Sequence, residues 1–183
     1  MQQQDIPKSV ESLLESFESC FSAPSFRRFK ILAVGWLLCS SRRWITRVIR
    51  AGGVEPGEHH AGFYRFFSTA RWEIDAVWRS LLRVLLPFIG QRIDVVVDDT
   101  LCRRKGPRIF GTAMHYDGSS PSGAAKGKAA SVACGHAWVV LALNMPVPWS
   151  SRGIAVPILA KLYRSPKRCP AAEYRSRSEI ARE

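Results

Sequence analysis

The first half of the chain repeats apolar residues at helical spacing. From residue 10 to residue 21 they recur three and four positions apart, which places them on one face of an amphipathic helix. The segment Ala23-Pro24-Ser25 is expected to end this helix, and the mostly apolar residues 26–39 predict a buried helix after it. A third, short helix is expected to follow Ser40-Ser41 and to end at Gly52-Gly53.

A longer helix is predicted to begin after Ser68 or Thr69 and to end near Phe88. Its apolar residues share one helical face: Ile74, Val77, Trp78, Leu81, Leu82 and Leu85. Pro87 and Gly90 end the pattern, because neither residue continues a helix well. The connections between the predicted helices are short, so residues 1–90 are expected to form a compact helical bundle with a possible role in DNA binding.

The spacing of apolar residues changes after residue 90 and predicts a sheet. Three strands are expected, at residues 93–97, 131–143 and 154–163. The first is rich in β-branched residues, as in a strand buried on both faces, and is expected to end in a turn at Asp98-Asp99-Thr100. The turn at 145–152 would join the other two in a hairpin, and 171–183 has the composition of a helix. The expected fold class is therefore α+β.

The net charge of the chain indicates which class of partner it binds. It contains 27 Lys and Arg against 15 Asp and Glu, which gives a net charge of +12 and a pI near 10.1. Residues 1–90 carry 12 basic and 8 acidic side chains, and residues 91–183 carry 15 and 7. Such an excess favours polyanions such as nucleic acid, although basic proteins without such partners are also common.

Cysteines and apolar runs exclude several other classes. The five cysteines are widely spaced and form no Cys-x-x-Cys pair, so a zinc site or a disulfide framework is not supported, and reduced thiols in the cytoplasm are expected. The longest apolar stretches are 31–39 and 132–149. The first is too short to span a bilayer, and the second contains His136 and two prolines, so we expect a buried strand and no membrane helix.

Clusters of basic residues are candidates for phosphate contacts. One lies on and before the third predicted helix: Arg42, Arg43, Arg47 and Arg50. Two more lie in loops of the second half: Arg103, Arg104 and Lys105, then Lys126 and Lys128. A helix-turn-helix contact with DNA and an ordinary solvated polar surface are equally compatible with the first cluster. Tryptophans among apolar residues, including Trp36 and Trp44, are expected in the core and not as platforms for bases.

Two adjacent carboxylates, Asp98 and Asp99, are the candidates for chemistry. Strand residues alternate between faces, so only one of the two would point to a given site. Carboxylates at the end of a buried strand need a cation or hydrogen bonds to remain charged, and Mg²⁺ prefers such hard oxygen ligands. The alternative is that an acid caps a turn or pairs with Arg103 or Arg104.

A series of short segments extends these observations. They are Asp98-Asp99-Thr100, Lys105-Gly106, Met114-His115-Tyr116-Asp117-Gly118, Gly127-Lys128, residues 135–143, Val156-Pro157-Ile158-Leu159 and Leu162-Tyr163-Arg164. In this order and spacing they resemble the start of the catalytic core of insertion-sequence transposases of the DDE superfamily endonuclease group. Residues 29–49 and 63–72 are similar to the helical N-terminal region of that group.

The resemblance implies a ribonuclease-H-like core. It makes Asp99 the first catalytic and metal-binding carboxylate, with Asp98 as its neighbour or substitute, and it implies Mg²⁺ as cofactor. In the intact enzyme of this group the substrate is DNA at the transposon ends, which is cleaved and joined. The basic residues Arg103, Arg104, Lys105, Lys126 and Lys128 would then lie along DNA phosphates.

The chain departs from the group in its later acidic residues. A DDE enzyme needs a second Asp and a Glu, but no Asp follows Asp117 here, and the later acids are Glu173, Glu179 and Glu183. One carboxylate cannot hold two magnesium ions. We therefore expect the first three strands and first helix of an incomplete core (residues 91–183), truncated before the second catalytic Asp, and the enzymatic activity of the chain itself stays open. The alternative is a non-catalytic DNA-binding remnant or an inhibitor of a full-length transposase; the expected protein partners are a second copy or that transposase.

Overall fold

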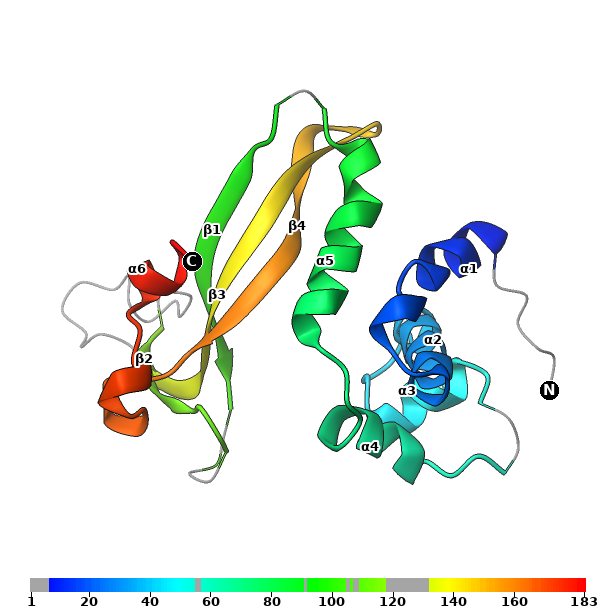
Figure 1. Ribbon diagram of the computed structural model, residues 1–183, viewed down its shortest axis with the longest axis horizontal. Coiled ribbons are helices and arrows are strands. Elements are labelled where there is room, and N and C mark those ends of the chain that lie inside the picture. The colour runs from blue at the N-terminus through cyan, green and yellow to red at the C-terminus, as the bar shows by residue number, and fades with distance from the viewer. Residues whose placement is uncertain (1–6, 55–56, 91, 105, 107–108, 118–131) are drawn as a thin grey trace. The chain divides into compact units, whose positions relative to one another are not determined.

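The computed structural model describes residues 7–54, 57–90, 92–104, 106, 109–117 and 132–183. The chain divides into two compact units, Met1–Pro87 and Phe88–Glu183, which are described separately below (Figure 1). The first unit is helical and the second contains a sheet, so the predicted α+β class is confirmed.

The described residues of the first unit contain five α-helices: α1 (Lys8–Glu15), α2 (Ala23–Leu38), α3 (Ile45–Ala51), α4 (Ala61–Ser68) and α5 (Ile74–Leu85). The first predicted helix is shorter than expected, because α1 ends at Glu15 and a single 3-10 turn, Glu18–Cys20, follows it. Ala23-Pro24-Ser25 does not precede the next helix but forms its first turn, where proline fixes a helical φ and its missing N–H costs nothing. None of the helices in the described part of the chain is long and apolar enough to cross a membrane.

The predicted long helix from Ser68 or Thr69 is wrong at its start. Ser68 is the last residue of α4, and α5 begins at Ile74. The connection is held in place by Trp72, whose indole Nε1 donates to the carbonyl oxygen of Phe66 at 2.8 Å. The helical spacing from Ile74 to Leu85 corresponds to α5, but Ile74 is 49% exposed and the buried residue of this helix is Ser80. The interruption before α5 depends on the hydrogen bond between Trp72 in the connection and Phe66 in α4.

The core of the first unit lies between α2, α3 and α4. Its buried residues are Leu32, Cys39, Val48, Ile49, Phe63 and Phe66, and Val48 and Phe63 have no exposed surface. The helices α2 and α3 approach each other closely at Gly35, where a Cβ atom would lie 2.0 Å from the carbonyl oxygen of Val48. Trp36 and Trp44 do not join this core: they are 50% and 57% exposed, so the expectation that both are core residues is wrong.

In the second unit the residues that the structure describes form an antiparallel sheet of four strands: β1 (Val95–Arg103), β2 (Ala113–Tyr116), β3 (Val132–Val147) and β4 (Ser150–Tyr163). The long strand β3 is central. It pairs with β1 on one edge, and with β4 and the short β2 on the other (Figure 1). The predicted hairpin of the last two strands is confirmed. The sequence had not shown β2, whose four residues are too few to display a period.

Asp98, Asp99 and Thr100 lie inside β1, so the predicted turn at these residues is wrong. They pair with Val140, Val139 and Trp138 of β3, and the strand continues to Arg103 opposite Gly135. The hydrogen bonds of this partner strand, distant in sequence, keep the polar residues extended. Burial on both faces is also wrong, since Val95, Val96 and Val97 are each 45–56% exposed.

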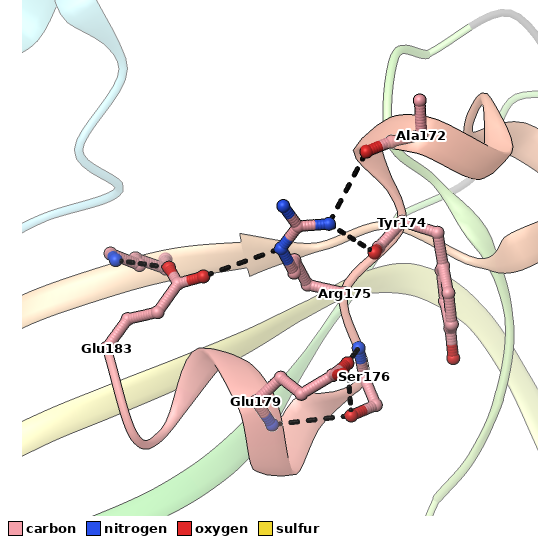
Figure 2. Close-up of polar contacts among 7 residues, drawn as sticks. Ala172, Tyr174, Arg175, Ser176, Glu179 and Glu183 are labelled. Atoms are coloured by element: carbon pink, nitrogen blue, oxygen red, sulfur yellow. Dashed lines mark hydrogen bonds and ion pairs between the residues drawn. The ribbon is translucent and has the colours of Figure 1, made fainter.

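The C-terminal segment is mostly irregular, where one helix over 171–183 was expected. It contains the 3-10 turns Pro166–Arg168 and Ala171–Glu173 and one helical turn, α6 (Arg177–Ile180). A capping box starts α6: Ser176 Oγ accepts from the Glu179 backbone N–H, and the Glu179 carboxylate accepts from the Ser176 N–H (Figure 2). Arg175 donates to the carbonyl oxygens of Ala172 and Tyr174, which are therefore engaged outside a helix (Figure 2).

Candidate functional site

Asp98 and Asp99 point to opposite faces of the sheet, because adjacent strand residues alternate. Asp99 shares its face with Val139 and Lys161, the residues opposite it on β3 and β4. The C-terminal segment lies on this face: Ile180 and Glu183 line a small cavity with Val97, Val139, Leu141, Leu159 and Lys161. Asp99 is thus the carboxylate placed next to α6, and Asp98 is on the other side.

Arg177 of α6 binds Asp99. Its Nη1 atom lies 2.5 Å from Asp99 Oδ2, and its guanidinium lies over the Tyr163 ring at 4.9 Å from the centroid. Its Nη2 atom lies 3.4 Å from His115 Nδ1. Asp99, His115, Tyr163 and Arg177 therefore form one group, the Asp99 cluster, to which β1, β2, β4 and α6 each contribute one residue.

His115 is buried within the cluster. Burial lowers the pKa of its imidazole, the adjacent Arg177 lowers it further, and Asp99 partly opposes the change. A guanidinium only donates hydrogen bonds, so His115 Nδ1 accepts and the proton of the neutral ring lies on Nε2. That Nε2 atom is buried and has no hydrogen-bond partner among the described residues. The imidazole is thus a neutral, incompletely bonded group beside the candidate carboxylate.

Tyr163 closes the other side of the cluster. Its ring meets the His115 ring edge to face at 5.7 Å between centroids and the Tyr174 ring at 6.5 Å. Burial raises the pKa of the Tyr163 hydroxyl, and the hydrogen bond and the charge of Tyr174 raise it further, while Arg177 opposes the change. The neutral phenol provides an aromatic face for Arg177, which positions the guanidinium over Asp99.

The described residues do not fit a divalent metal centre. One oxygen of Asp99 already accepts from Arg177, and no group of three or more His, Cys, Asp or Glu side chains gathers within the ranges that the structure describes. Five other acids near the sheet have cationic partners or cap a helix: Asp94 with Arg92, Asp117 with Arg103, Glu173 with Arg164, Glu183 with Lys161, and Glu179 at α6. Asp98 lies on the opposite face, where its Oδ1 atom accepts from the Asp99 backbone N–H at 2.8 Å. Mg²⁺ needs several oxygen ligands, which this donor set does not supply.

Asp117 forms a second ion pair, which the sequence did not reveal. It is 3% exposed, and its Oδ2 atom accepts from Arg103 Nε at 2.7 Å. The alternative reading, in which Asp98 or Asp99 pairs with Arg103 or Arg104, is therefore wrong in its partners: Asp99 takes Arg177 and Asp117 takes Arg103. Arg104 instead approaches the carbonyl oxygen of Arg103 at 3.5 Å.

The structure describes only some of the basic residues that are predicted to contact DNA. Arg43 donates to the carbonyl oxygen of Trp36, and Arg47 to Ser41 Oγ, while Arg42 and Arg50 are exposed. Lys105, Lys126 and Lys128 lie outside the described residues. The structure therefore positions the first basic cluster on the first unit, and the role of each of these residues stays a prediction.

Sequence reasoning found Asp99 but missed His115, Tyr163 and Arg177. A signal existed for two of them, because His115 and Tyr163 belong to segments that carried the family resemblance. Arg177 has no such signal, because nothing in the sequence distinguishes it from the other arginines of the C-terminal segment. The five cysteines, which were expected to be reduced, are all free.

A comparison with protein-family models matches residues 16–183 to the DDE superfamily endonuclease family. No curated protein and no solved structure matches the chain. The match includes the helices α2 to α5, all four strands and the Asp99 cluster, and it agrees with the resemblance drawn from the separate segments of the sequence. Because the matched region omits only the first 15 residues, the chain belongs to the DDE superfamily endonuclease family.

Proposed function

We propose that this protein acts on DNA in the transposition of an insertion sequence, in the manner of a DDE transposase. The observation that carries the proposal is the position of Asp99: an acidic residue on β1, within the family match, next to a group of polar side chains from three other elements. In this proposal Asp99 is the first catalytic carboxylate of a ribonuclease-H-like core, and Asp98 on the opposite face is its neighbour. The proposed place of action is the cytoplasm.

Enzymes of this superfamily generally use divalent metal ions. The Asp99 cluster offers one carboxylate, held by Arg177, and so we derive no catalytic step from it. We propose that the remaining carboxylates come from a partner, such as a second copy or a full-length transposase. Binding of a metal at Asp99 through both oxygens would require Arg177 to leave Oδ2, whereas binding through Oδ1 alone would leave this contact in place.

DNA contacts are proposed for both units. Arg42 and Arg43 lie in the connection between α2 and α3, and Arg47 and Arg50 lie along α3. From this place the exposed side chains can reach phosphates. In the second unit the proposed contacts are Arg103, Arg104, Lys105, Lys126 and Lys128. The net charge of +12 supports a polyanionic partner for the whole chain.

A second candidate function is non-catalytic DNA binding, as a remnant or an inhibitor of a full-length transposase. A specific observation favours it: the carboxylate expected to bind metal is neutralised by Arg177, and the described residues supply no second free carboxylate on that face. Under this proposal the protein occupies transposon DNA or pairs with the active enzyme without cleaving.

A nicking assay separates the two functions. The purified chain is incubated with supercoiled plasmid and Mg²⁺ or Mn²⁺, alongside Asp99→Ala and the matched control Asp94→Ala. Asp94 is an exposed acid of the same unit that precedes β1 and pairs with Arg92. The catalytic proposal expects nicking that Asp99→Ala abolishes and Asp94→Ala leaves intact.

The absence of nicking, together with DNA binding, supports the non-catalytic function. Nicking that persists in Asp99→Ala contradicts the assigned role of Asp99. A chain that neither nicks nor binds DNA contradicts both functions.

A further inference from the structure

Two exposed tryptophans lie where α2 ends and α3 begins. Trp36 is 50% exposed and Trp44 is 57% exposed, and Leu37 between them is 72% exposed. The two places are joined directly, because Arg43 Nε donates to the carbonyl oxygen of Trp36 at 3.2 Å. We call this region, formed by residues 36–38 and 41–47, the Trp36–Trp44 surface.

The charge around the Trp36–Trp44 surface is positive. No acidic residue occurs between Ser19 and Val54, a stretch that contains seven Lys and Arg. Arg42, Arg43 and Arg47 belong to this surface, and Arg50 follows on α3. An anionic partner is therefore attracted to the same place at which the indoles are exposed.

Arg47 and Trp44 are arranged as a stacked pair. The Arg47 guanidinium lies 5.1 Å from the centre of the Trp44 ring and also donates to Ser41 Oγ at 3.0 Å. These two contacts hold the guanidinium over the indole while more than half of Trp44 stays open to solvent. A planar cation beside an open aromatic face is suited to a flat ligand that carries negative charge.

The combination indicates unpaired nucleotides. Contacts to duplex phosphates need only cations, and the bases of a duplex are stacked on one another and present only their edges. Unpaired bases instead expose their faces and stack on aromatic side chains, while basic residues follow the backbone. A partner protein that covered the two tryptophans would have to neutralise the nearby arginines as well.

We infer that the Trp36–Trp44 surface binds single-stranded DNA, with a base stacked on Trp44 and flanking phosphates held by Arg42, Arg43 and Arg47. The inference rests on the proposed action on DNA and specifies the form of DNA that this surface takes. Trp36 offers a second position for a base on the same surface.

The test compares two oligonucleotides that have the same phosphates. One is a fluorescently labelled oligothymidine, and the other is a chain of equal length made of abasic sites. Binding of each to the full chain is measured by fluorescence anisotropy for the wild type, Trp44→Ala, Trp36→Ala and Trp44→Phe. Trp149→Ala is the matched control, because Trp149 is 78% exposed and lies in the other unit.

We expect Trp44→Ala to weaken binding of the oligothymidine by about 5- to 150-fold and to leave binding of the abasic chain unchanged. Trp44→Phe keeps an aromatic ring and should retain most of the affinity for the oligothymidine. If Trp44→Ala fails to fold, the affinities of Trp44→Phe for the two oligonucleotides are compared instead. Trp149→Ala should change neither affinity.

Equal losses on both oligonucleotides, or no loss on either, would overturn the inference. It would also be overturned by sedimentation showing a wild-type dimer that Trp44→Ala dissociates, because a second copy would then cover the surface. Salt-dependent binding of duplex DNA without any effect of Trp44→Ala would contradict this inference alone. The failure of the wild type to bind either duplex or single-stranded DNA would contradict the proposed function as well.

Discussion

At the residue scale, the chemistry of Asp99 is decided by an arginine 78 positions later in the chain. Arg177 holds a permanent positive charge next to one carboxylate oxygen of Asp99, and its guanidinium makes a cation–π contact with the Tyr163 ring. While this contact is in place, only the Oδ1 atom of Asp99 is left to bind another cation.

The contribution of this contact to stability is measurable. Arg177→Ala should lower the free energy of unfolding of the second unit by about 1 kcal/mol, because a half-exposed ion pair contributes about 0–1 kcal/mol and a cation–π contact about 0.5–1 kcal/mol. Urea unfolding followed by circular dichroism checks this. Arg182→Ala, which removes an exposed arginine from the same segment, should have a smaller effect, and equal effects would argue against a specific role for Arg177.

His115 should make the second unit sensitive to acid. Its pKa is lowered in the folded protein by burial and by Arg177, so in the pH range below the ordinary value of 6.5 the unfolded chain binds a proton before the folded chain does. Stability is therefore complete above about pH 7 and falls as the pH decreases through 6.5 toward the folded pKa.

Thermal unfolding of the wild type and of His115→Gln at several pH values checks this expectation. The variant should lose less stability than the wild type between about pH 7.5 and pH 5.5, because glutamine does not titrate. Parallel pH profiles for the two proteins would show that the buried imidazole does not contribute to the acid sensitivity.

At the element scale, glycine sets how closely α2 approaches α3. A Cβ at Gly35 would meet the backbone of Val48, which cannot move without displacing α3, whereas a Cβ at Gly62 in α4 would meet only the flexible side chain of Arg28 at 3.0 Å. Both positions are helical glycines, but their neighbours differ. Substitution by alanine should therefore change the free energy of unfolding in opposite directions at the two positions.

Gly35→Ala should destabilise the first unit by about 1–3 kcal/mol or more through overpacking. Gly62→Ala should be neutral or stabilising by up to about 1 kcal/mol, because alanine favours a helix more than glycine does. Chemical unfolding of both variants checks the pair, and a tolerated Gly35→Ala would contradict the close approach of the two helices.

The strands show a similar dependence on neighbours. The spacing of residues 93–97 located a strand, but its length and exposure were set by β3, which pairs with it as far as Arg103 and leaves Val95 to Val97 partly open. Asp98 and Asp99 are poor strand residues by propensity, and a strand of four apolar residues followed by acids reads as ending there. Pairing with Val140 and Val139 overrode that local preference.

At the scale of the whole molecule, the dominant property is the net charge of +12. DNA binding should weaken steeply with salt, because each neutralised phosphate releases counterions. The logarithm of the binding constant for duplex DNA should fall linearly with the logarithm of the salt concentration.

Replacing both Arg42 and Arg50 by alanine should reduce the magnitude of that slope by roughly 2, about 0.9 for each lost phosphate contact. Fluorescence anisotropy with duplex DNA at several salt concentrations measures it. Arg92→Ala serves as the control, since Arg92 is exposed, pairs with Asp94 and has no proposed DNA contact. A binding constant that does not depend on salt would contradict the DNA contacts proposed for the arginines.

The sequence by itself determined the helical first half, the β3–β4 hairpin and the positive charge, and it made Asp99 the candidate carboxylate. These follow from the spacing of apolar residues, from turn residues and from segment order, all of which are local or additive properties of the chain. Only the tertiary structure decided that Asp99 lies inside a strand, that β2 exists, that Trp36 and Trp44 are exposed, and that Arg177 and His115 join Asp99. The physical reason is that each depends on a partner distant in sequence: strand pairing, burial and ion pairing are set by which surfaces meet, and no short window of sequence contains both of them.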